Sequence, residues 1–252
     1  MSWPTALITG ASTGIGADLA RALVKRGTKV ALVARRKELL DTLVTELGGP
    51  DHAIGIVADV ADPMRAAAAV DEAYERLGNK LDLVIANAGT GYNKKASELK
   101  VEHIVGVLQL NVMGACATLT AAIPHMVAAG SGHLVAITSL AGMRGLPTSA
   151  AYSASKAALS VFAESLRVDL RSSGIYVTDV RPGFIDTPLT KKNKFKMPFL
   201  LSSPEAADRI VRALDRKKRV FAFPWPTAMG MRFMAALPAP LYEWVAGKTA
   251  PR

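Results

Sequence analysis

Residues 9–16 read Thr-Gly-Ala-Ser-Thr-Gly-Ile-Gly, and this stretch decides the fold. It follows an apolar run at 5–10 and opens a segment with helical spacing at 14–25. Glycines let the backbone turn sharply and approach a pyrophosphate, whose charge rests on the free N–H groups of the helix start. The pattern G-x-x-x-G-x-G predicts a dinucleotide-binding turn, with an ordinary glycine-rich turn as the alternative. The candidate cofactor-binding residues here are Gly10, Ser12, Thr13, Gly14, Ile15 and Gly16.

The alternation of strand and helix continues outward from this turn. Apolar runs typical of strands recur at 29–34, 53–58, 81–86, 133–138, 175–180 and 220–223. Helical spacing occupies 37–47, 63–77, 102–129, 151–171 and 204–215. The runs are continuously apolar, as expected when helices cover both faces of a parallel sheet. The sequence therefore predicts an α/β fold: a doubly wound parallel sheet of the Rossmann type, with about seven strands and helices on both faces.

The composition agrees with one ordered domain. The chain has 252 residues, of which 50% are hydrophobic and 21% charged, so disorder is excluded as its main state. No repeat or long linker divides it, and we expect a single domain over residues 1–252. Residues 187–252 change character, with a lysine cluster and then a tail rich in Pro, Met and aromatic residues. We expect a substrate lid and a C-terminal appendage there.

Charge and cysteine content limit the classes of partner and site. The net charge of +10 favours an anionic partner, whether nucleic acid, an acidic membrane surface or a phosphorylated cofactor. The single cysteine, Cys116, excludes an intrachain disulfide, and the four histidines lack the spacing of metal ligands, so no metal is expected. The chain start lacks a basic secretory signal, and we expect a cytoplasmic location.

The end of the second predicted strand bears on the choice of cofactor. An acidic side chain there would pair with the ribose hydroxyls of NAD, but this chain has Ala34 followed by Arg35 and Arg36. Guanidinium groups bind phosphate well, so a 2′-phosphate and hence NADP(H) is predicted. The alternative is that both arginines simply begin a solvated helix.

Tyr152 and Lys156 are candidates for acid–base chemistry. Their spacing puts both side chains on one face of a helix, one turn apart. A free tyrosine titrates near pH 10, and a neighbouring ammonium favours the phenolate, so we expect Lys156 to lower the pKa of Tyr152. Taken alone, such a pair also occurs by chance on helix surfaces.

The ordered combination of motifs is far more specific than any one of them. Taken together, the chain resembles the short-chain dehydrogenase/reductase family, in its single-domain branch of about 250 residues. The resemblance runs from Thr5 to about Thr187 and rests on the glycine turn, Asn87-Ala88-Gly89, Asn111, Ser139, the Tyr152/Lys156 helix and Pro182-Gly183.

The resemblance implies catalytic roles for four residues. Tyr152 would be the general acid in carbonyl reduction and the base in alcohol oxidation. Ser139 would orient the substrate oxygen. Lys156 would bind the nicotinamide ribose as well as act on Tyr152, and Asn111 would hold a water in a proton relay.

The resemblance also implies further cofactor contacts. Asp59 and Val60 would contact adenine, and Asn87, Ala88 and Gly89 would line the cleft. The nicotinamide end would be bordered by Pro182, Gly183, Ile185 and Thr187. Two departures stand out: Thr13 replaces a basic residue found in many NADP-using members, and the C-terminal ending differs from that of enzymes acting on carrier-bound acyl chains.

The expected function is an NADP(H)-dependent oxidoreductase that interconverts a secondary alcohol and a ketone, or acts on an aldehyde, of hydrophobic character. Its partner is a small-molecule carbonyl or alcohol substrate. The alternatives are a non-catalytic nucleotide-binding scaffold or sensor, and a membrane-peripheral reductase of lipid-like carbonyls. A homodimer or homotetramer is expected, and the resemblance implies that a dimer would form through the helices at 102–129 and 151–171.

Two segments of the last third allow alternatives. The lysine cluster at 191–196 is interpreted as a loop over the active site rather than a nucleic-acid site, with 197–201 as an apolar lid. Prolines interrupt the apolar tail, so no transmembrane segment is predicted. Weak contact with a membrane surface through Trp225, Phe233, Tyr242 and Trp244 is the alternative to covering the cleft or a dimer partner.

Overall fold

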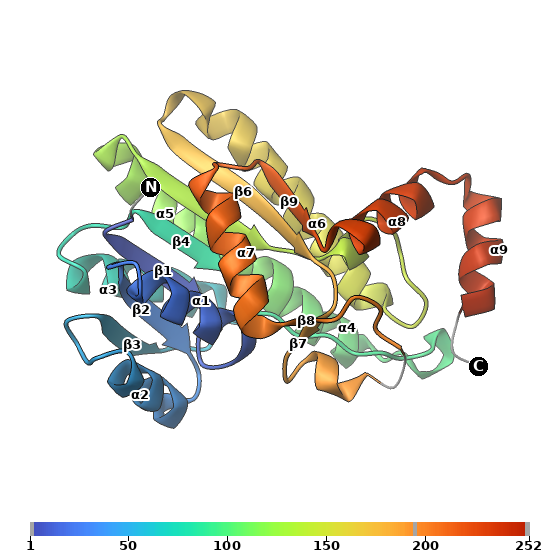
Figure 1. The fold of residues 1–252 in the computed structure, drawn as a ribbon, viewed down its shortest axis with the longest axis horizontal. Coiled ribbons are helices and arrows are strands. Elements are labelled where there is room, and N and C mark those ends of the chain that lie inside the picture. The colour runs from blue at the N-terminus through green and yellow to red at the C-terminus, as the bar shows by residue number, and fades with distance from the viewer. Residues whose placement is uncertain (1–2, 194–195, 250–252) are drawn as a thin grey trace.

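A computed structural model describes residues 3–193 and 196–249. Its centre is a parallel sheet with the strand order β3-β2-β1-β4-β5-β6-β9 (Figure 1). The predicted doubly wound sheet is therefore confirmed. The strands are β1 (Thr5–Thr9), β2 (Lys29–Ala34), β3 (Ala53–Val57), β4 (Leu83–Ala86), β5 (Gly132–Ile137), β6 (Ile175–Pro182) and β9 (Val220–Phe223).

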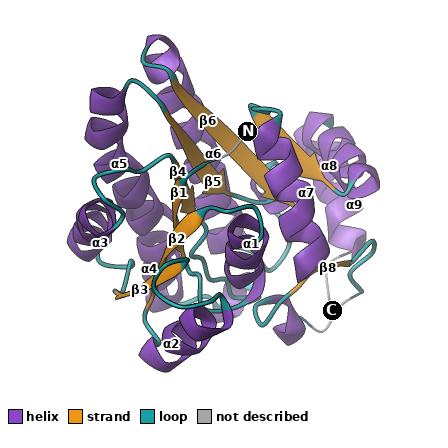
Figure 2. Ribbon diagram, turned by 60° about the vertical axis from the view of Figure 1, so that its left-hand side comes forward, coloured by secondary structure: helices purple, strands orange, loops and turns teal. Residues whose placement is uncertain are grey.

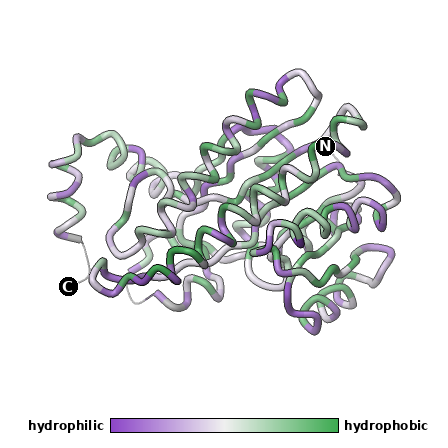
Figure 3. Tube along the Cα trace, turned by 180° about the vertical axis from the view of Figure 1, so that it is seen from behind, coloured by the Kyte–Doolittle hydropathy of each residue, from purple (hydrophilic) through white to green (hydrophobic). Residues whose placement is uncertain are grey.

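Helices cover both faces of the sheet (Figure 2). Successive strand side chains point to opposite faces, so Ala6 and Ile8 enter one core cluster and Leu7 the other. The first cluster lies under α1 (Gly14–Val24), α2 (Lys37–Glu46) and α7 (Ser203–Asp215). The second lies under α3 (Pro63–Arg76), α5 (Ala115–Ala129) and α6 (Ala150–Asp169). Figure 3 shows hydrophobic colouring along the central strands and hydrophilic colouring on the outer turns.

Local sequence signals set where several helices begin. Asp62 caps α3, because its carboxylate accepts hydrogen bonds from the N–H groups of Met64 and Arg65 at 2.9 and 3.4 Å. Ser202 caps α7 in the same way, with Glu205 N–H as the donor. Short 3₁₀ turns lie at Ala96–Glu98, Leu140–Gly142, Leu170–Ser172 and Thr190–Lys192.

The long helix predicted at 102–129 differs in one respect from the expectation. It runs through α4 (Val101–Leu108) and α5, but the segment Gln109–Gly114 between them has π-helical geometry. A Cβ on Gly114 would lie 1.9 Å from the carbonyl oxygen of Val60, so glycine is needed for this close approach. By length and composition alone, this helix at Val101–Ala129 could cross a membrane. It packs here on α3, α6 and the sheet.

The last third of the chain joins the sheet edge and continues beyond it. A two-stranded sheet of β7 (Ile185–Asp186) and β8 (Leu201–Ser202) closes the base of the segment between them. After β9, helices α8 (Trp225–Ala236) and α9 (Ala239–Thr249) project past the end of the sheet, at the right of Figure 1. Tyr242 attaches α9: its hydroxyl donates to the carbonyl of Gly145, and the Arg144 guanidinium lies 4.4 Å from its ring centroid.

Candidate active site

The glycine turn after β1 packs against the end of β4. Gly10 has a φ of +65°, and a Cβ there would lie 2.7 Å from Ala88 Cα. A Cβ on Gly16 would lie 2.4 Å from the Gly10 carbonyl oxygen and 2.6 Å from Asn87 Nδ2. That amide donates to the carbonyls of Thr9 and Gly10 at 3.0 and 3.3 Å. The turn therefore requires glycine, because backbone fills the space that a side chain would take.

The start of α1 is able to hold an anion. Thr13 precedes the helix without a side-chain cap, and the first turn contains no acidic residue. Its backbone N–H groups and the positive end of the helix dipole are consequently available to a pyrophosphate. Gly14, with a φ of +58°, lies opposite Thr187 on the far side of this opening. The arrangement fits the phosphates of a dinucleotide.

Two arginines stand beside this turn. Arg36 Nη2 donates to Ser12 Oγ at 3.1 Å and to Thr13 Oγ1 at 3.3 Å. Arg35 Nη1 lies 3.7 Å from Asp59 Oδ2, and both side chains are more than half exposed. Since Ala34 carries no carboxylate, the guanidinium groups and the two hydroxyls together offer hydrogen-bond donors to a phosphate.

A cleft of about 380 Å³ runs along the carboxyl ends of the strands. It contains nearly all of the predicted site residues: Gly10, Ser12, Thr13, Gly14, Ile15, Arg35, Arg36, Asp59, Val60, Asn87, Ala88, Gly89, Ser139, Tyr152, Lys156, Pro182, Gly183, Ile185 and Thr187. Gly16 and Asn111 do not line it. The sequence analysis did not single out Leu110, Ile137, Thr138, Pro188, Leu189 and Thr190, which also line it.

Lys156 is buried at the floor of the cleft. It is 3% exposed, and its Nζ donates to the Ile137 carbonyl at 2.8 Å and lies 5.8 Å from the centroid of the Tyr152 ring. Burial lowers the pKa of Lys156 to about 8, and the charge of Asp179 opposes that shift. The ammonium is thus easier to deprotonate than a surface lysine.

Tyr152 and Ser139 face the same space. Burial raises the pKa of Tyr152, and its hydrogen bond with Ser139 acts in the opposite direction. We had expected Lys156 to lower the pKa of Tyr152; in this structure desolvation of the phenolate outweighs any such effect. Ser139 Oγ accepts from Ala141 N–H at 3.1 Å, which orients its hydroxyl.

Asn111 is fully buried in the π-helical segment. Its Nδ2 donates to the Thr90 carbonyl at 2.8 Å and to Ser155 Oγ at 3.0 Å, and its Oδ1 accepts from Thr90 N–H at 2.8 Å. A Cβ on Gly89 would lie 3.3 Å from Asn111 Oδ1 and 3.4 Å from Lys156 Nζ. The Asn111 side chain therefore links the π-helical segment to the loop after β4, next to the buried ammonium group of Lys156.

Asp179 is a buried carboxylate that the sequence analysis missed. It lies in β6, with no exposed surface, and accepts from Thr138 Oγ1 at 2.5 Å and Arg181 Nε at 2.7 Å. A single acidic residue in a mostly buried strand was the available signal. Its negative charge favours the charged form of Lys156.

A second, larger cavity of about 680 Å³ adjoins the cleft. Five residues line both: Ser139, Tyr152, Gly183, Leu189 and Thr190. The outer walls come from the loops after β4 and β5, from the segment after β6 and from α8. Met197, Pro198, Phe199, Leu200 and Leu201, expected as an apolar lid, line neither cavity, and residues 194–195 of the lysine cluster lie outside the described residues.

Metal and thiol chemistry have little support. The described residues contain no group of His, Cys, Asp and Glu able to hold a metal ion. Burial raises the pKa of the Cys116 thiol to about 11, so its reactive thiolate form is suppressed.

Comparisons with known proteins agree with this geometry. A family model described as short chain dehydrogenase matches residues 4–197. An uncharacterized oxidoreductase of Myxococcus xanthus is 43% identical over 247 residues, covering 96% of each chain. A short-chain dehydrogenase of Sphingobium yanoikuyae solved with NADPH has a TM-score of 0.81 and 29% identity, covering 94% of this chain and 97% of that one. The 3-ketoacyl-(acyl-carrier-protein) reductase of Brucella melitensis, solved with NADH, has a TM-score of 0.81 and 26% identity, covering 88% and 96%.

Proposed function

Because the chain belongs to the short-chain dehydrogenase family and is an oxidoreductase of that family, we propose that it uses NADP(H) to interconvert an alcohol and a ketone or aldehyde of hydrophobic character. The observation that carries the proposal is the meeting of the two cavities at Ser139 and Tyr152. A carbonyl group in the larger cavity would lie beside both of these residues, because both line that cavity.

The residues present fit the cofactor. The turn at Gly10 to Gly16 and the start of α1 would hold the pyrophosphate, and Arg35 and Arg36 with Ser12 and Thr13 would hold a 2′-phosphate. Lys156 would donate to the nicotinamide ribose. When bound, the nicotinamide supplies hydride to the carbonyl carbon, or accepts it from the alcohol carbon.

The proton is handled by the protein. In reduction, Tyr152 gives its phenolic proton to the carbonyl oxygen, while Ser139 donates a hydrogen bond to that oxygen as negative charge develops. A charged Lys156 stabilises the phenolate that is left behind. Asn111 is the residue proposed to hold a water that returns the proton, although its side-chain amide is already bonded to Thr90 and Ser155. In oxidation the same steps run in reverse.

Replacing Tyr152 by Phe tests this assignment. Tyr152→Phe removes the hydroxyl and keeps the ring, so turnover should fall about a thousandfold while NADPH binding is retained. Consumption of NADPH over a panel of aliphatic, aromatic, steroid and sugar carbonyls measures the rate, and cofactor fluorescence measures binding. Tyr92→Phe is the matched control, since Tyr92 lines the same cavity without lining the cofactor cleft. An undiminished rate in Tyr152→Phe would refute the role.

We also propose that the protein is a homo-oligomer, that its location is cytoplasmic, and that it is a single domain with a C-terminal lid and appendage. Exposed apolar side chains on the α4–α5 helix and on α6 support a homodimer through these helices: Val101, Val105, Met113, Val127, Val161 and Val168. The aromatic residues exposed on α8 and α9, Trp225, Phe233 and Trp244, keep membrane-surface contact as the alternative.

A further inference from the structure

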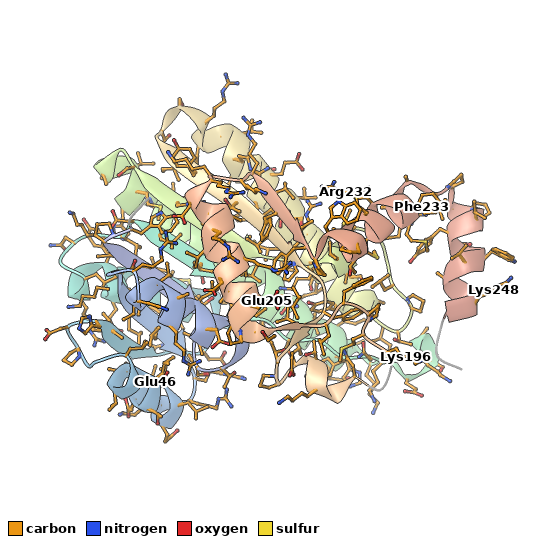
Figure 4. All side chains as sticks on the ribbon, viewed as in Figure 1. Glu46, Lys196, Glu205, Arg232, Phe233 and Lys248 are labelled. Carbon is orange, nitrogen blue, oxygen red and sulfur yellow. The ribbon has the colours of Figure 1, made fainter. Side chains whose placement is uncertain are left out.

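The larger cavity combines apolar walls with positive charge. Of the described residues, those that line it include no Asp and no Glu, but they include Lys94 and Lys196. Leu146, Phe184 and Met231 supply much of the apolar wall. Figure 4 labels Lys196 on the segment between β7 and β8. The cavity can therefore accept an apolar body together with a negatively charged group.

The backbone of Lys94 is hydrogen-bonded to the loop that carries Thr148. Its N–H donates to the carbonyl of Thr148 at 2.8 Å. The preceding side chain, Asn93, accepts from Ser149 Oγ at 3.2 Å and donates to Asn193 Oδ1 at 2.6 Å. Thr148 has a φ of +61°, which is uncommon for a β-branched residue and marks a constrained backbone. Three loops are thus joined at the position from which Lys94 extends.

The two ammonium groups form no salt bridge with a carboxylate among the described residues, so neither charge is neutralised by the protein at the cavity wall. Lys94 is half-buried, so its charge is less screened by water than a fully exposed one. Thr227, on α8, also lines the cavity, and its buried Oγ1 has no hydrogen-bond partner in the described chain. These unsatisfied groups point to a ligand with anionic and oxygen-bearing character.

We propose that the substrate is an amphiphilic carbonyl compound with an anionic end, a carboxylate or a phosphate, bound by Lys94 and Lys196. The carbonyl lies at Ser139 and Tyr152, and the apolar body lies along Leu146 and Met231. This inference rests on the proposed function, because it assigns the substrate class of the same site.

The test uses methyl ketones of medium chain length, each with a terminal carboxylate, a terminal phosphate or a neutral methyl ester. We expect kcat/KM with NADPH to be about tenfold higher for the better anion than for the ester. Lys94→Gln and Lys196→Gln should each lower that preference about threefold, mainly through KM, and leave the ester unchanged. The carboxylate and phosphate arms show which anion is preferred. Lys95→Gln is the matched control, because Lys95 is an exposed neighbour that lines neither cavity.

Equal kcat/KM for ester and anions in the wild type would overturn the inference and leave the oxidoreductase assignment intact. If none of these ketones is reduced, a binding measurement distinguishes failure of this inference from failure of the oxidoreductase assignment. Calorimetric titration with a medium-chain fatty carboxylate and its methyl ester requires no turnover. Tighter carboxylate binding that is weakened by Lys94→Gln and by added salt supports the inference; equal binding of the two overturns it.

Discussion

The nucleotide cleft and the larger cavity are built in different ways. The cleft is lined by short stretches at the carboxyl ends of β1 to β6 together with α6, and its glycine turn packs closely against backbone atoms, as at Gly16. The cavity is assembled from segments far apart in the chain, joined by side chains such as Asn93 and Asn193. Backbone contacts tolerate only glycine, whereas side-chain contacts accept many residue types. We infer that cofactor binding is rigidly specified and that substrate choice is adjustable.

The largest effect is expected at the backbone contacts of the cleft. Gly16→Ala would place a methyl 2.4 Å from a carbonyl oxygen, so the free energy of unfolding should fall by about 3 kcal/mol and cofactor binding should be largely lost. Urea denaturation and NADPH titration measure both. Gly106→Ala is the control, because the space around its Cβ is open. If Gly16→Ala behaves like Gly106→Ala, the cleft is not rigidly specified.

An intermediate effect is expected at Lys156, which lines the cleft one helical turn from Tyr152. Its folded-state pKa of about 8 lies below the ordinary 10.5, so between these values the unfolded chain binds more protons. Stability therefore rises with pH over this window, by on the order of 2 kcal/mol from this group. Below it the buried charge is destabilising, and Lys156→Met should be more stable than the wild type while losing activity.

Urea denaturation of the wild type and Lys156→Met from neutral pH to about pH 10.5 measures this difference. The free energy of unfolding of the wild type should rise relative to that of the variant as the pH increases. An exposed lysine provides the control, and Lys95→Met should follow the wild type. A difference that stays constant with pH contradicts the lowered pKa.

The smallest effect is expected at the rim of the cleft. Arg36→Ser should weaken NADPH binding about tenfold and NADH binding hardly at all, because only the 2′-phosphate is lost from the interaction. Arg35→Ser should show the same direction with a smaller loss, since Asp59 already neutralises part of its charge. Fluorescence titration with both cofactors measures this. Lys37→Ser controls for net charge, and equal losses for NADPH and NADH would contradict phosphate recognition.

The sequence predicted the features that depend on nearby residues, and it did not predict those that depend on contacts between distant segments. The central strands, the two helix layers and the glycine turn followed from apolar periodicity and local motifs. The same signals did not predict the π-helical turn around Asn111, the helices α8 and α9, or the contribution of Lys94 to the cavity. Their causes lie in contacts with residues distant in sequence, such as Gly114 against Val60 and Tyr242 against Gly145. The raised pKa of Tyr152 was missed for the same reason, because burial is a property of the folded chain.

By itself, the amino-acid order determined the layered sheet and the positions of the phosphate-binding turn and the Tyr152/Lys156 helix, since these depend on periodicity and on glycine conformation over a few residues. The tertiary structure alone decided which protonated forms are favoured in the site and which lysines line the larger cavity. Both depend on desolvation and on charges brought together from separate loops, which no local pattern encodes.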